Sequence, residues 1–336
     1  MIRVAVDAMG GDHAPLEIVK GAVDATNQRS DIQVQLVGIP DQIEAVLSQT
    51  SYRREQISII PASEVIETAE PPVIAIRSKR DSSIVVGMKQ VKNGEADAFV
   101  SGGSTGAVLV GGQLIVGRVE GVRRPPLAPL IPTLEGVSLL IDCGANVDAR
   151  PDHLVQFAQM GSVYMRDVVG VKNPRVAIVN IGAEEEKGNA LVKETMPLLK
   201  ACEGINFIGS IEAREIPYGK ADVIVCEAFV GNVILKLYEG TAGALMKVIK
   251  DSLLSSTRGK IGALLAKPSL AGIKKKFDSS EYGGAPLLGL NGLVVKAHGS
   301  SKAKDITSAI FQCAVFKEQA IADKIQALMS QKGKES

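Results

Sequence analysis

The sequence predicts an α/β protein with a largely parallel sheet, covered by helices on both faces in a three-layer, Rossmann-like α/β/α sandwich. Short β-branched runs alternate with stretches of helical periodicity along most of the chain, a pattern typical of β-α-β units. The runs are almost continuously apolar, as expected of strands buried on both faces. No linker rich in Ser, Gly or Pro divides the 336 residues. We expect one continuous domain over residues 1–330, with a bilobal shape left open, and a frayed tail at 331–336.

Strands are expected where β-branched runs lie between turn residues, at Arg3–Asp7, Gln33–Gly38, Ile57–Pro61, Asp97–Ser101, Ser138–Asp142, Arg175–Asn180, Asn206–Gly209, Asp222–Cys226 and Leu293–Lys296. Helices are expected between them, most clearly at Pro15–Gln28, Asp41–Ser48, Ser82–Lys92, Asp152–Val168, Asn189–Ala201, Asn232–Leu254 and Ser301–Met329. Several of these helices open after Asp, Asn or Ser, whose side chains accept hydrogen bonds from first-turn N–H groups.

Composition and charge exclude several classes of protein. With 38 Lys and Arg against 37 Asp and Glu, the chain is not a global nucleic-acid binder. The four cysteines have no CxxC spacing and the three histidines no metal-binding spacing, so we expect no metal site and no disulfide framework. A reducing cytoplasm fits best, and the first residues leave no room for a signal peptide. The uncharged run Phe99–Gly117 is rich in Gly, Ser and Thr, which favours a strand end, a turn and a helix start over a membrane span.

The loops after the predicted strands are the places to look for a site, because ligands of open α/β sheets bind outside the carboxyl ends of the strands. Gly10 and Gly11 follow the first strand and permit close main-chain approach. A Gly/Ser/Thr turn follows Val100 and leads into a helix, whose N-terminus is a ready anion site; it contains Gly103, Ser104, Thr105 and Gly106. The turn lacks the GxGxxG spacing of dinucleotide sites, and plain turn chemistry is its alternative reading.

Other strand exits carry further candidates. Asn180 and Lys187 flank a run of glutamates, which as a group read better as a solvated helix start, whereas Lys187 can reach an anion. Glycine-containing turns occur at Gly231-Asn232 and Gly283-Gly284. His13 and His298 lie in such loops and His153 at a helix start, where a histidine is more often a cap or a packed residue than a catalytic one. Cys143 has no basic neighbour in sequence, which favours a core thiol over a nucleophile.

Several motifs, in this order along the chain, resemble those of the bacterial phosphate acyltransferases. They are DAMGGDHAP (7–15), AIRSKRDSS (75–83), NGEADAFVSGGSTGA (93–107), IDCGANVD (141–148), NPRVAIVNIGAEEEKGN (173–189), CEAFVGNVILKLYEG (226–240), YGGAPLLGLNG (282–292) and HGSS (298–301). The sequence departs from the family pattern at Ser104, Ala183, Glu227, Ala228 and Val230. The departures at Ala183 and Val230 put a direct catalytic role at those two positions in doubt.

The resemblance implies transfer of a long-chain acyl group from acyl-carrier protein to inorganic phosphate, giving an acyl phosphate for phospholipid synthesis. It also implies a fold similar to phosphotransacetylases and isopropylmalate dehydrogenase-like proteins, a homodimer, no cofactor, and a cytoplasmic protein at the membrane periphery, near a membrane acyltransferase. An NAD-dependent hydroxyacid dehydrogenase and a non-enzymatic membrane-docking scaffold are the alternatives. The missing GxGxxG motif disfavours the dehydrogenase.

Phosphorolysis of a thioester needs no covalent enzyme nucleophile, because phosphate is itself an anionic nucleophile. It needs donors for phosphate and for the oxyanion, and a proton for sulfur. The glycine turns can supply N–H donors, Ser104, Thr105, Asn180 and Lys187 side-chain contacts, and His13 or His298 the proton. Arg77, Lys79 and Arg80 can bind carrier protein or phosphate, with a solvated helix end as the alternative. Asp7 and Asp12 would repel phosphate if ionised and close to it, so we expect them to cap the turn or to orient a cation.

A basic segment within residues 240–277 carries a different message. Between Leu245 and Lys276 there are eight Lys and Arg and one acid, Asp251, with apolar residues at helical spacing between them. Such an amphipathic helical protrusion suits an anionic bilayer, and the long tail of an acyl phosphate favours this reading once the resemblance is accepted. Packing against a dimer partner is the alternative. The predicted membrane contacts are Leu253, Leu264, Leu265, Lys274, Lys275 and Lys276.

Overall fold

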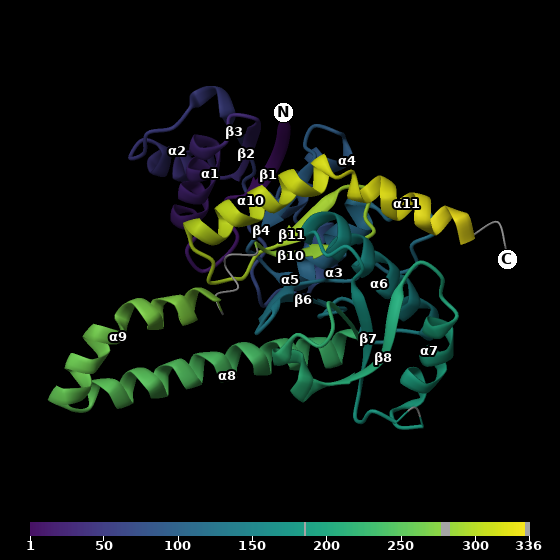
Figure 1. Ribbon diagram of the computed structural model, residues 1–336. Helices are drawn as coiled ribbons and strands as arrows, with labels where there is room; N and C mark the ends of the chain where they lie inside the picture. The colour runs from purple at the N-terminus through teal and green to yellow at the C-terminus, as the bar shows by residue number, and fades with distance from the viewer. Residues whose placement is uncertain (185, 277–282, 333–336) are drawn as a thin grey trace.

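The computed structural model describes residues 1–184, 186–276 and 283–332 and contains two mainly parallel sheets (Figure 1). The first sheet has the order β10-β11-β4-β1-β2-β3, with β1 (Ile2–Asp7), β2 (Ile32–Gly38), β3 (Ile57–Pro61), β4 (Ala98–Ser101), β10 (Ala285–Leu287) and β11 (Leu293–Lys296). The second has the order β5-β6-β9-β7-β8, with β5 (Leu130–Thr133), β6 (Gly136–Ile141), β7 (Arg175–Asn180), β8 (Asn206–Glu212) and β9 (Val223–Val225). The α/β class is confirmed.

Helices connect and cover these strands. They are α1 (Leu16–Gln28), α2 (Pro40–Leu47), α3 (Pro72–Ser78), α4 (Ser83–Lys92), α5 (Thr105–Gly111), α6 (Pro151–Tyr164), α7 (Ala190–Lys200), α8 (Ala228–Leu254), α9 (Thr257–Lys276), α10 (Ala303–Glu318) and α11 (Ile321–Lys332). Short helical turns occur at η1 (Arg54–Gln56), η2 (Gly112–Val116), η3 (Met165–Val169) and η4 (Ala213–Tyr218). Ser82 and Asn189 cap α4 and α7, as their sequence positions suggest.

Each sheet is covered by different helices on its two faces. In β4, Ala98 and Val100 pack in the cluster that contains α1 and α10, whereas Phe99 packs in the cluster that contains α3, α4 and α5. This alternation follows from the two-residue period of a strand. In the second sheet, Leu139 packs in the cluster that contains α6, and Leu140 packs in the cluster under the start of α8.

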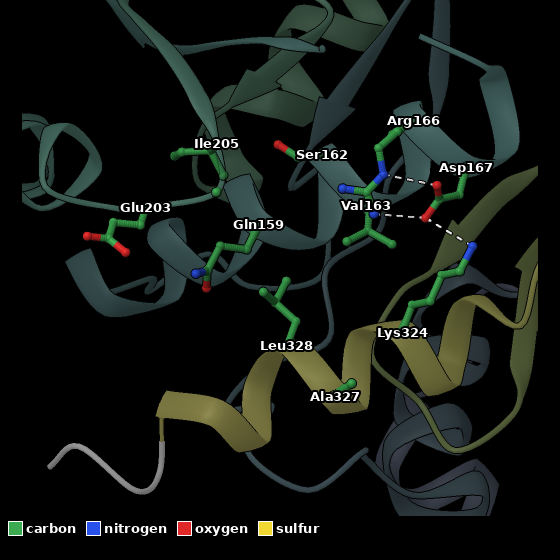
Figure 2. Close-up of a pocket in the computed structure, with 11 residues that line it drawn as sticks. Gln159, Ser162, Val163, Arg166, Asp167, Glu203, Ile205, Lys324, Ala327 and Leu328 are labelled. Carbon is green, nitrogen blue, oxygen red and sulfur yellow. Dashed lines mark hydrogen bonds and ion pairs between the residues drawn. The ribbon is translucent and has the colours of Figure 1, made fainter. Parts of the chain in front are cut away.

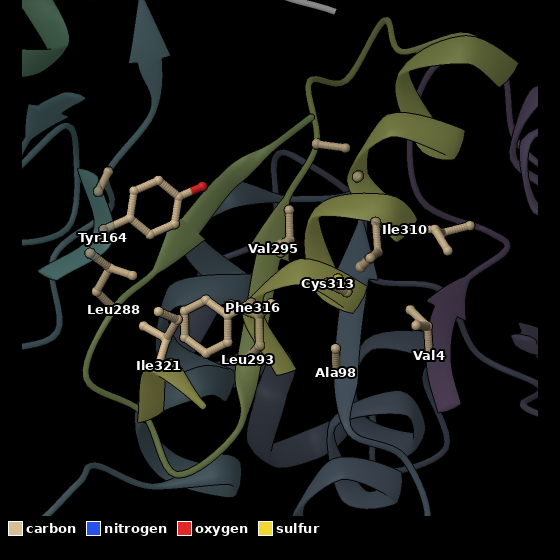
Figure 3. Packing of buried hydrophobic residues seen from close by; sticks show 14 of the residues in the cluster. Val4, Ala98, Tyr164, Leu288, Leu293, Val295, Ile310, Cys313, Phe316 and Ile321 are labelled. Atoms are coloured by element: carbon tan, nitrogen blue, oxygen red, sulfur yellow. The ribbon is translucent and has the colours of Figure 1, made fainter. Parts of the chain in front are cut away.

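One continuous hydrophobic cluster extends across both sheets. Figure 3 shows Tyr164 of α6 and Leu288 beside Phe316 of α10 and Ile321 of α11. The Tyr164 hydroxyl accepts a hydrogen bond of 2.7 Å from the Gln312 side chain. Residues 126–128 pair with residues 286–288 through main-chain hydrogen bonds, which join the two sheets at their antiparallel edges.

The edge strands β5 and β10 were not expected from the sequence. Both are short, contain a proline (Pro132 and Pro286) and pair antiparallel with β6 and β11. Proline lacks the N–H that a central strand needs but is tolerated at an edge. The single helix expected at Ser301–Met329 is also wrong, since Ala320, at φ 49°, separates α10 from α11. This turn brings Ile321 and Ile325 into the shared core.

Helices α8 and α9 extend away from the sheets as a long pair (Figure 1). No helix in the part of the chain that the structure describes is long and apolar enough to cross a membrane. The expected tail at 331–336 lies mostly outside the described residues, and residues 331–332 continue α11.

Candidate active site

The loops that follow β1, β4 and β11 meet at one edge of the first sheet, because these strands are neighbours in it. The main-chain N–H of Asp12 donates to the carbonyl of Gly299 over 2.8 Å, and that of Ala297 donates to the carbonyl of Ser101 over 2.9 Å. Three motifs that lie far apart in sequence therefore form one cluster. We call it the first-sheet loops (residues 7–15, 101–106 and 296–301).

Glycine is required where the main chains of these loops touch. A Cβ on Gly10 would lie 2.3 Å from the Asp7 carboxylate and 2.7 Å from the main-chain nitrogen of Gly103. A Cβ on Gly102 would lie 2.9 Å from the Gly10 carbonyl. Gly11 has φ +112° and faces the Gly299 carbonyl. The spacing of the loops therefore depends on the absence of side chains.

Asp7 is buried beneath the first-sheet loops and organises them. Its carboxylate accepts hydrogen bonds from the Ser101 hydroxyl over 2.6 Å and from the Met9 N–H over 3.1 Å. The Gly103 N–H in turn donates to the Ser101 oxygen over 3.0 Å. Burial raises the pKa of Asp7. Asp7 therefore caps the turn after β1, which is one of the roles that the sequence suggests for it.

Lys296 was missed by the sequence analysis. It ends β11 and is only 9% exposed. Its ammonium group donates to the carbonyl of Gly102 over 3.3 Å and to the carbonyl of Ala297. Burial lowers the pKa of Lys296 to about 8, against the opposing effect of Asp7. The only sequence signal was a lysine at the end of an otherwise apolar strand.

Helix α5 opens beside these glycines. Ser104 is its N-cap and accepts from the Ala107 N–H over 3.4 Å. The N–H groups of Thr105 and Gly106 fall in the first turn, where no intrahelical acceptor exists. Gly106 packs against Pro72 of α3, since a Cβ there would lie 2.4 Å from the proline ring. Thr105 is exposed, so this helix start is open to a ligand.

Two of the three histidines lie in the first-sheet loops, and both are exposed. The Nδ1 atom of His298 accepts from the Ser300 N–H over 3.2 Å. The Ser300 hydroxyl oxygen lies 2.8 Å from the same nitrogen; with Nδ1 as the acceptor of these contacts, the neutral ring carries its proton on Nε2. His298 can therefore donate that proton outward, and His13 lies in the adjoining loop. His153 is buried at the start of α6, where its Nδ1 accepts from the Arg150 N–H over 3.2 Å.

The predicted basic group lies on and after α3, which packs against α5. Lys79 is already engaged: its ammonium group contacts Glu70 at 2.6 Å and donates to the Val65 carbonyl over 2.7 Å. Arg77 and Arg80 are exposed. Of the three basic residues, these two are the more available to a partner.

A buried hydrogen-bonded cluster around Asp142 follows β6, and it was not predicted from the sequence. The Asp142 carboxylate accepts from the Leu127 N–H over 2.9 Å, and from the main-chain N–H and the side-chain amide of Asn146, each over 2.7 Å. Burial raises the pKa of Asp142 to about 6. Cys143 beside it is buried too, and burial raises its pKa to about 12, which makes it a poor nucleophile.

The start of α8 packs on this hydrogen-bonded cluster. A Cβ on Gly231 would lie 1.9 Å from the Asp142 carbonyl oxygen, and the Gly231 N–H already donates to the Glu227 carbonyl over 3.0 Å. Gly231 thus serves close packing, while Asn232 beside it is exposed. Burial is the main cause of the lowered pKa of Lys296. The positive charge of Lys236, further along α8, lowers this pKa as well, whereas Asp7 acts in the opposite direction.

The loop after β7 forms its contacts internally. Lys187 pairs with Glu184 at 3.0 Å. The Asn180 amide donates to the Lys187 carbonyl over 3.3 Å, and its oxygen accepts from the Ile181 N–H over 2.8 Å. Within the described residues, none of these hydrogen bonds or ion pairs reaches the first-sheet loops. Lys187 and Asn180 are thus not joined to the other candidates by any such contact.

Gly283 and Gly284 also serve packing. The Gly284 N–H donates to the Gln312 side chain over 3.1 Å. A Cβ on Gly284 would lie 2.6 Å from the Lys296 carbonyl, and Gly283 has φ +80°. Gly284 lets the start of β10 lie against β11, and Gly283 lies against Gln312 of α10.

The chain matches a family model described as "Fatty acid synthesis protein" over residues 2–324. It is 53% identical over 311 residues to a phosphate acyltransferase of Desulfitobacterium hafniense, covering 92% of each chain. It is 50% identical over 333 residues to a phosphate acyltransferase of Alkaliphilus oremlandii, covering 99% of this chain and 98% of that one. The chain belongs to the phosphate acyltransferase family. It is an acyltransferase, and the dehydrogenase alternative is not favoured.

Solved structures support the fold of this family member. A phosphotransacetylase of Streptococcus pyogenes superposes with a TM-score of 0.61 at 17% identity, covering 94% of each chain. A 4-hydroxythreonine-4-phosphate dehydrogenase of Klebsiella pneumoniae superposes with a TM-score of 0.52 at 15% identity, covering 96% of this chain and all of that one.

The departures of this acyltransferase from the family pattern have structural places. Glu227 is the N-cap of α8 and accepts from the N–H groups of Phe229 and Val230 over 2.6 and 2.9 Å. Ala228 is buried and donates its N–H to the Asn146 carbonyl over 3.1 Å. Val230 is half-buried against the second-sheet core, whereas Ala183 is exposed.

A hollow of about 340 Å³ lies elsewhere in the acyltransferase, between the end of α6, the loop before β8, and α11 (Figure 2). Three of its charged side chains pair with one another, since Asp167 contacts Arg166 at 2.9 Å and Lys324 at 3.3 Å. The hollow shares no residue with the first-sheet loops. Among the described residues, no group of three or more His, Cys, Asp and Glu is placed to hold a metal ion.

Proposed function

We propose that the protein transfers a long-chain acyl group from acyl-carrier protein to inorganic phosphate, and that the acyl phosphate supplies phospholipid synthesis. The observation that carries this proposal is the convergence of the first-sheet loops around the open start of α5. First-turn N–H groups and a helix N-terminus favour a bound anion. The names of the relatives, all phosphate acyltransferases, support phosphate as that anion.

The proposed step needs nucleophile, oxyanion and leaving group in one place. A phosphate oxygen attacks the thioester carbonyl carbon, a C–O bond forms, and the C–S bond breaks. The Nε2–H of His298 can protonate the departing sulfur, with His13 as the alternative donor. The N–H groups of Thr105 and Gly106 can bind phosphate or the oxyanion. The exposed Arg77 and Arg80 can meet the acidic surface of the carrier protein.

The direct test is release of carrier-protein thiol from long-chain acyl-carrier protein, without added metal or nucleotide. We expect release only when inorganic phosphate is present, with acyl phosphate formed in equal amount. Omission of phosphate is the matched control. Absence of release at every phosphate concentration would contradict the proposal.

We propose further that the protein is a homodimer bound peripherally to anionic membranes, close to a membrane acyltransferase. The support is exposed apolar surface: Leu237, Leu245 and Val248 of α8 are 68%, 58% and 61% exposed, and Leu264 and Leu265 of α9 are 71% and 78% exposed. We assign the first set to the dimer partner and the second to the bilayer. Leu253 is half-buried at the end of α8, and the side chains of Lys274, Lys275 and Lys276 lie outside the described ones.

Leu264→Asp combined with Leu265→Asp is expected to lower binding to anionic vesicles by at least about tenfold, because two exposed apolar side chains leave the interface and two negative charges enter it. Vesicle sedimentation measures this loss. The control is Leu198→Asp on α7, a residue that is 46% exposed and expected to have no effect. Equal binding of the double variant and the wild type would refute the membrane role of α9.

A further inference from the structure

Lys296 is unusual among the basic residues of this protein. The sequence contains 38 Lys and Arg, and within the part that the structure describes Lys296 is the one that is buried. Its ammonium group donates to two main-chain carbonyls, those of Gly102 and Ala297. Among the described residues, no carboxylate lies within ion-pair distance of it.

Removing an ammonium group from water without a direct counter-ion costs several kcal/mol. The nearby acid that acts on Lys296 most strongly is Asp7. Burial raises the pKa of Asp7 as well, which weakens it as a permanent counter-charge. The surroundings of the Lys296 ammonium group therefore lack a compensating negative charge, which an anionic ligand would supply.

The two carbonyls that Lys296 holds belong to two different first-sheet loops. Gly102 precedes Gly103 and the start of α5, and Ala297 precedes His298. Fixing both carbonyls on one ammonium group therefore fixes the distance between the α5 start and the histidine.

We propose that Lys296 is a positioning residue for phosphate: it holds the Gly102 and Ala297 loops together and supplies a positive charge beneath the phosphate that they bind. The inference rests on the proposed function, since it takes phosphate as the anion. It assigns Lys296 an effect on phosphate and not on the acyl donor.

The test compares Lys296→Gln with Lys296→Arg. Glutamine keeps N–H donors for the carbonyls but removes the charge, whereas arginine keeps the charge. We expect Lys296→Gln to raise the KM for phosphate by about tenfold or more and to leave the KM for the acyl donor within about twofold. Arginine should restore most of the phosphate dependence. The matched control is Lys302→Gln, which changes an exposed lysine at the start of α10.

A second readout needs no turnover. Inorganic phosphate should raise the Tm of the wild type and of Lys296→Arg, but much less that of Lys296→Gln. The increase in the wild type should decline above about pH 8, where Lys296 loses its proton. Asp7, Asp12 and Lys236 face it electrostatically, and the decline should be absent in Lys296→Gln, which retains all three.

Equal phosphate responses of Lys296→Gln and the wild type would overturn the inference. An equal rise in the KM for phosphate and the KM for the acyl donor would overturn it too. A wild type that releases no thiol and gains no stability from phosphate would instead refute the proposed function, together with this inference. If Lys296→Gln fails to fold, a Lys296→Arg protein with a wild-type decline above pH 8 would overturn it, because arginine does not lose its charge there.

Discussion

Gly231→Ala is expected to lower the free energy of unfolding by about 3 kcal/mol. The added Cβ would lie 1.9 Å from the Asp142 carbonyl oxygen and 3.0 Å from the Cys226 sulfur, neither of which can move freely. Because the Asp142 carboxylate is held by Leu127 and Asn146, the strain would pass into the hydrogen-bonded cluster after β6. Denaturant unfolding followed by circular dichroism measures the loss.

The same helix provides the control for this substitution. A Cβ on Gly240 meets nothing within 4 Å. Alanine there removes the conformational cost of a glycine inside a helix, so Gly240→Ala should raise stability by up to about 1 kcal/mol. Similar stability of the two variants would mean that α8 does not pack closely on Asp142.

Gly10→Ala is expected to lower kcat/KM by roughly 10²–10³-fold, because misplaced donors in a site of this kind cost that much. Its Cβ would lie between the Asp7 carboxylate and the Gly103 nitrogen. Since Asp7, Ser101 and Gly103 form one hydrogen-bonded chain, the loops after β1 and β4 would separate and the start of α5 would shift. Phosphate-dependent thiol release measures the loss.

Gly299→Ala tests whether crowding is the cause. Gly299 lies in the same cluster, but a Cβ there meets nothing closer than the Asp12 carboxylate at 3.7 Å, an ordinary contact distance. We expect Gly299→Ala to retain activity within about threefold. A Gly10→Ala enzyme as active as Gly299→Ala would show that the loop spacing does not govern turnover.

The parallel strands could be predicted because each is an apolar β-branched run that ends at a turn. Residues 57–61, 175–180 and 293–296 form strands where the sequence indicates them. The edge strands could not be predicted in this way. Pro132 and Pro286 hide them, and the partner that makes each a strand is a neighbour in space.

The candidate site divides in the same way. Gly10, Gly103 and His298 could be found from loop composition, and the strand order brings them together. Lys296 could not, because its importance comes from burial and from carbonyls on two other segments. Gly231 differs from both: the sequence suggests it as an anion donor, which stays a prediction, while the structure shows close packing on Asp142 and an N–H that already donates to the Glu227 carbonyl.

The order of strands in the two sheets also bears on how the chain is made. All strands of the second sheet lie between residues 130 and 225, whereas the first sheet has β11, from residues 293–296, inserted beside β4. During synthesis from the N-terminus, the second sheet can therefore be completed while the ribosome still holds the rest. The first sheet must wait until residues 293–296 have been made, with the edge of β4 unpaired until then. Chaperone protection of a nascent chain would matter most in this interval, which is also the interval before the first-sheet loops can form.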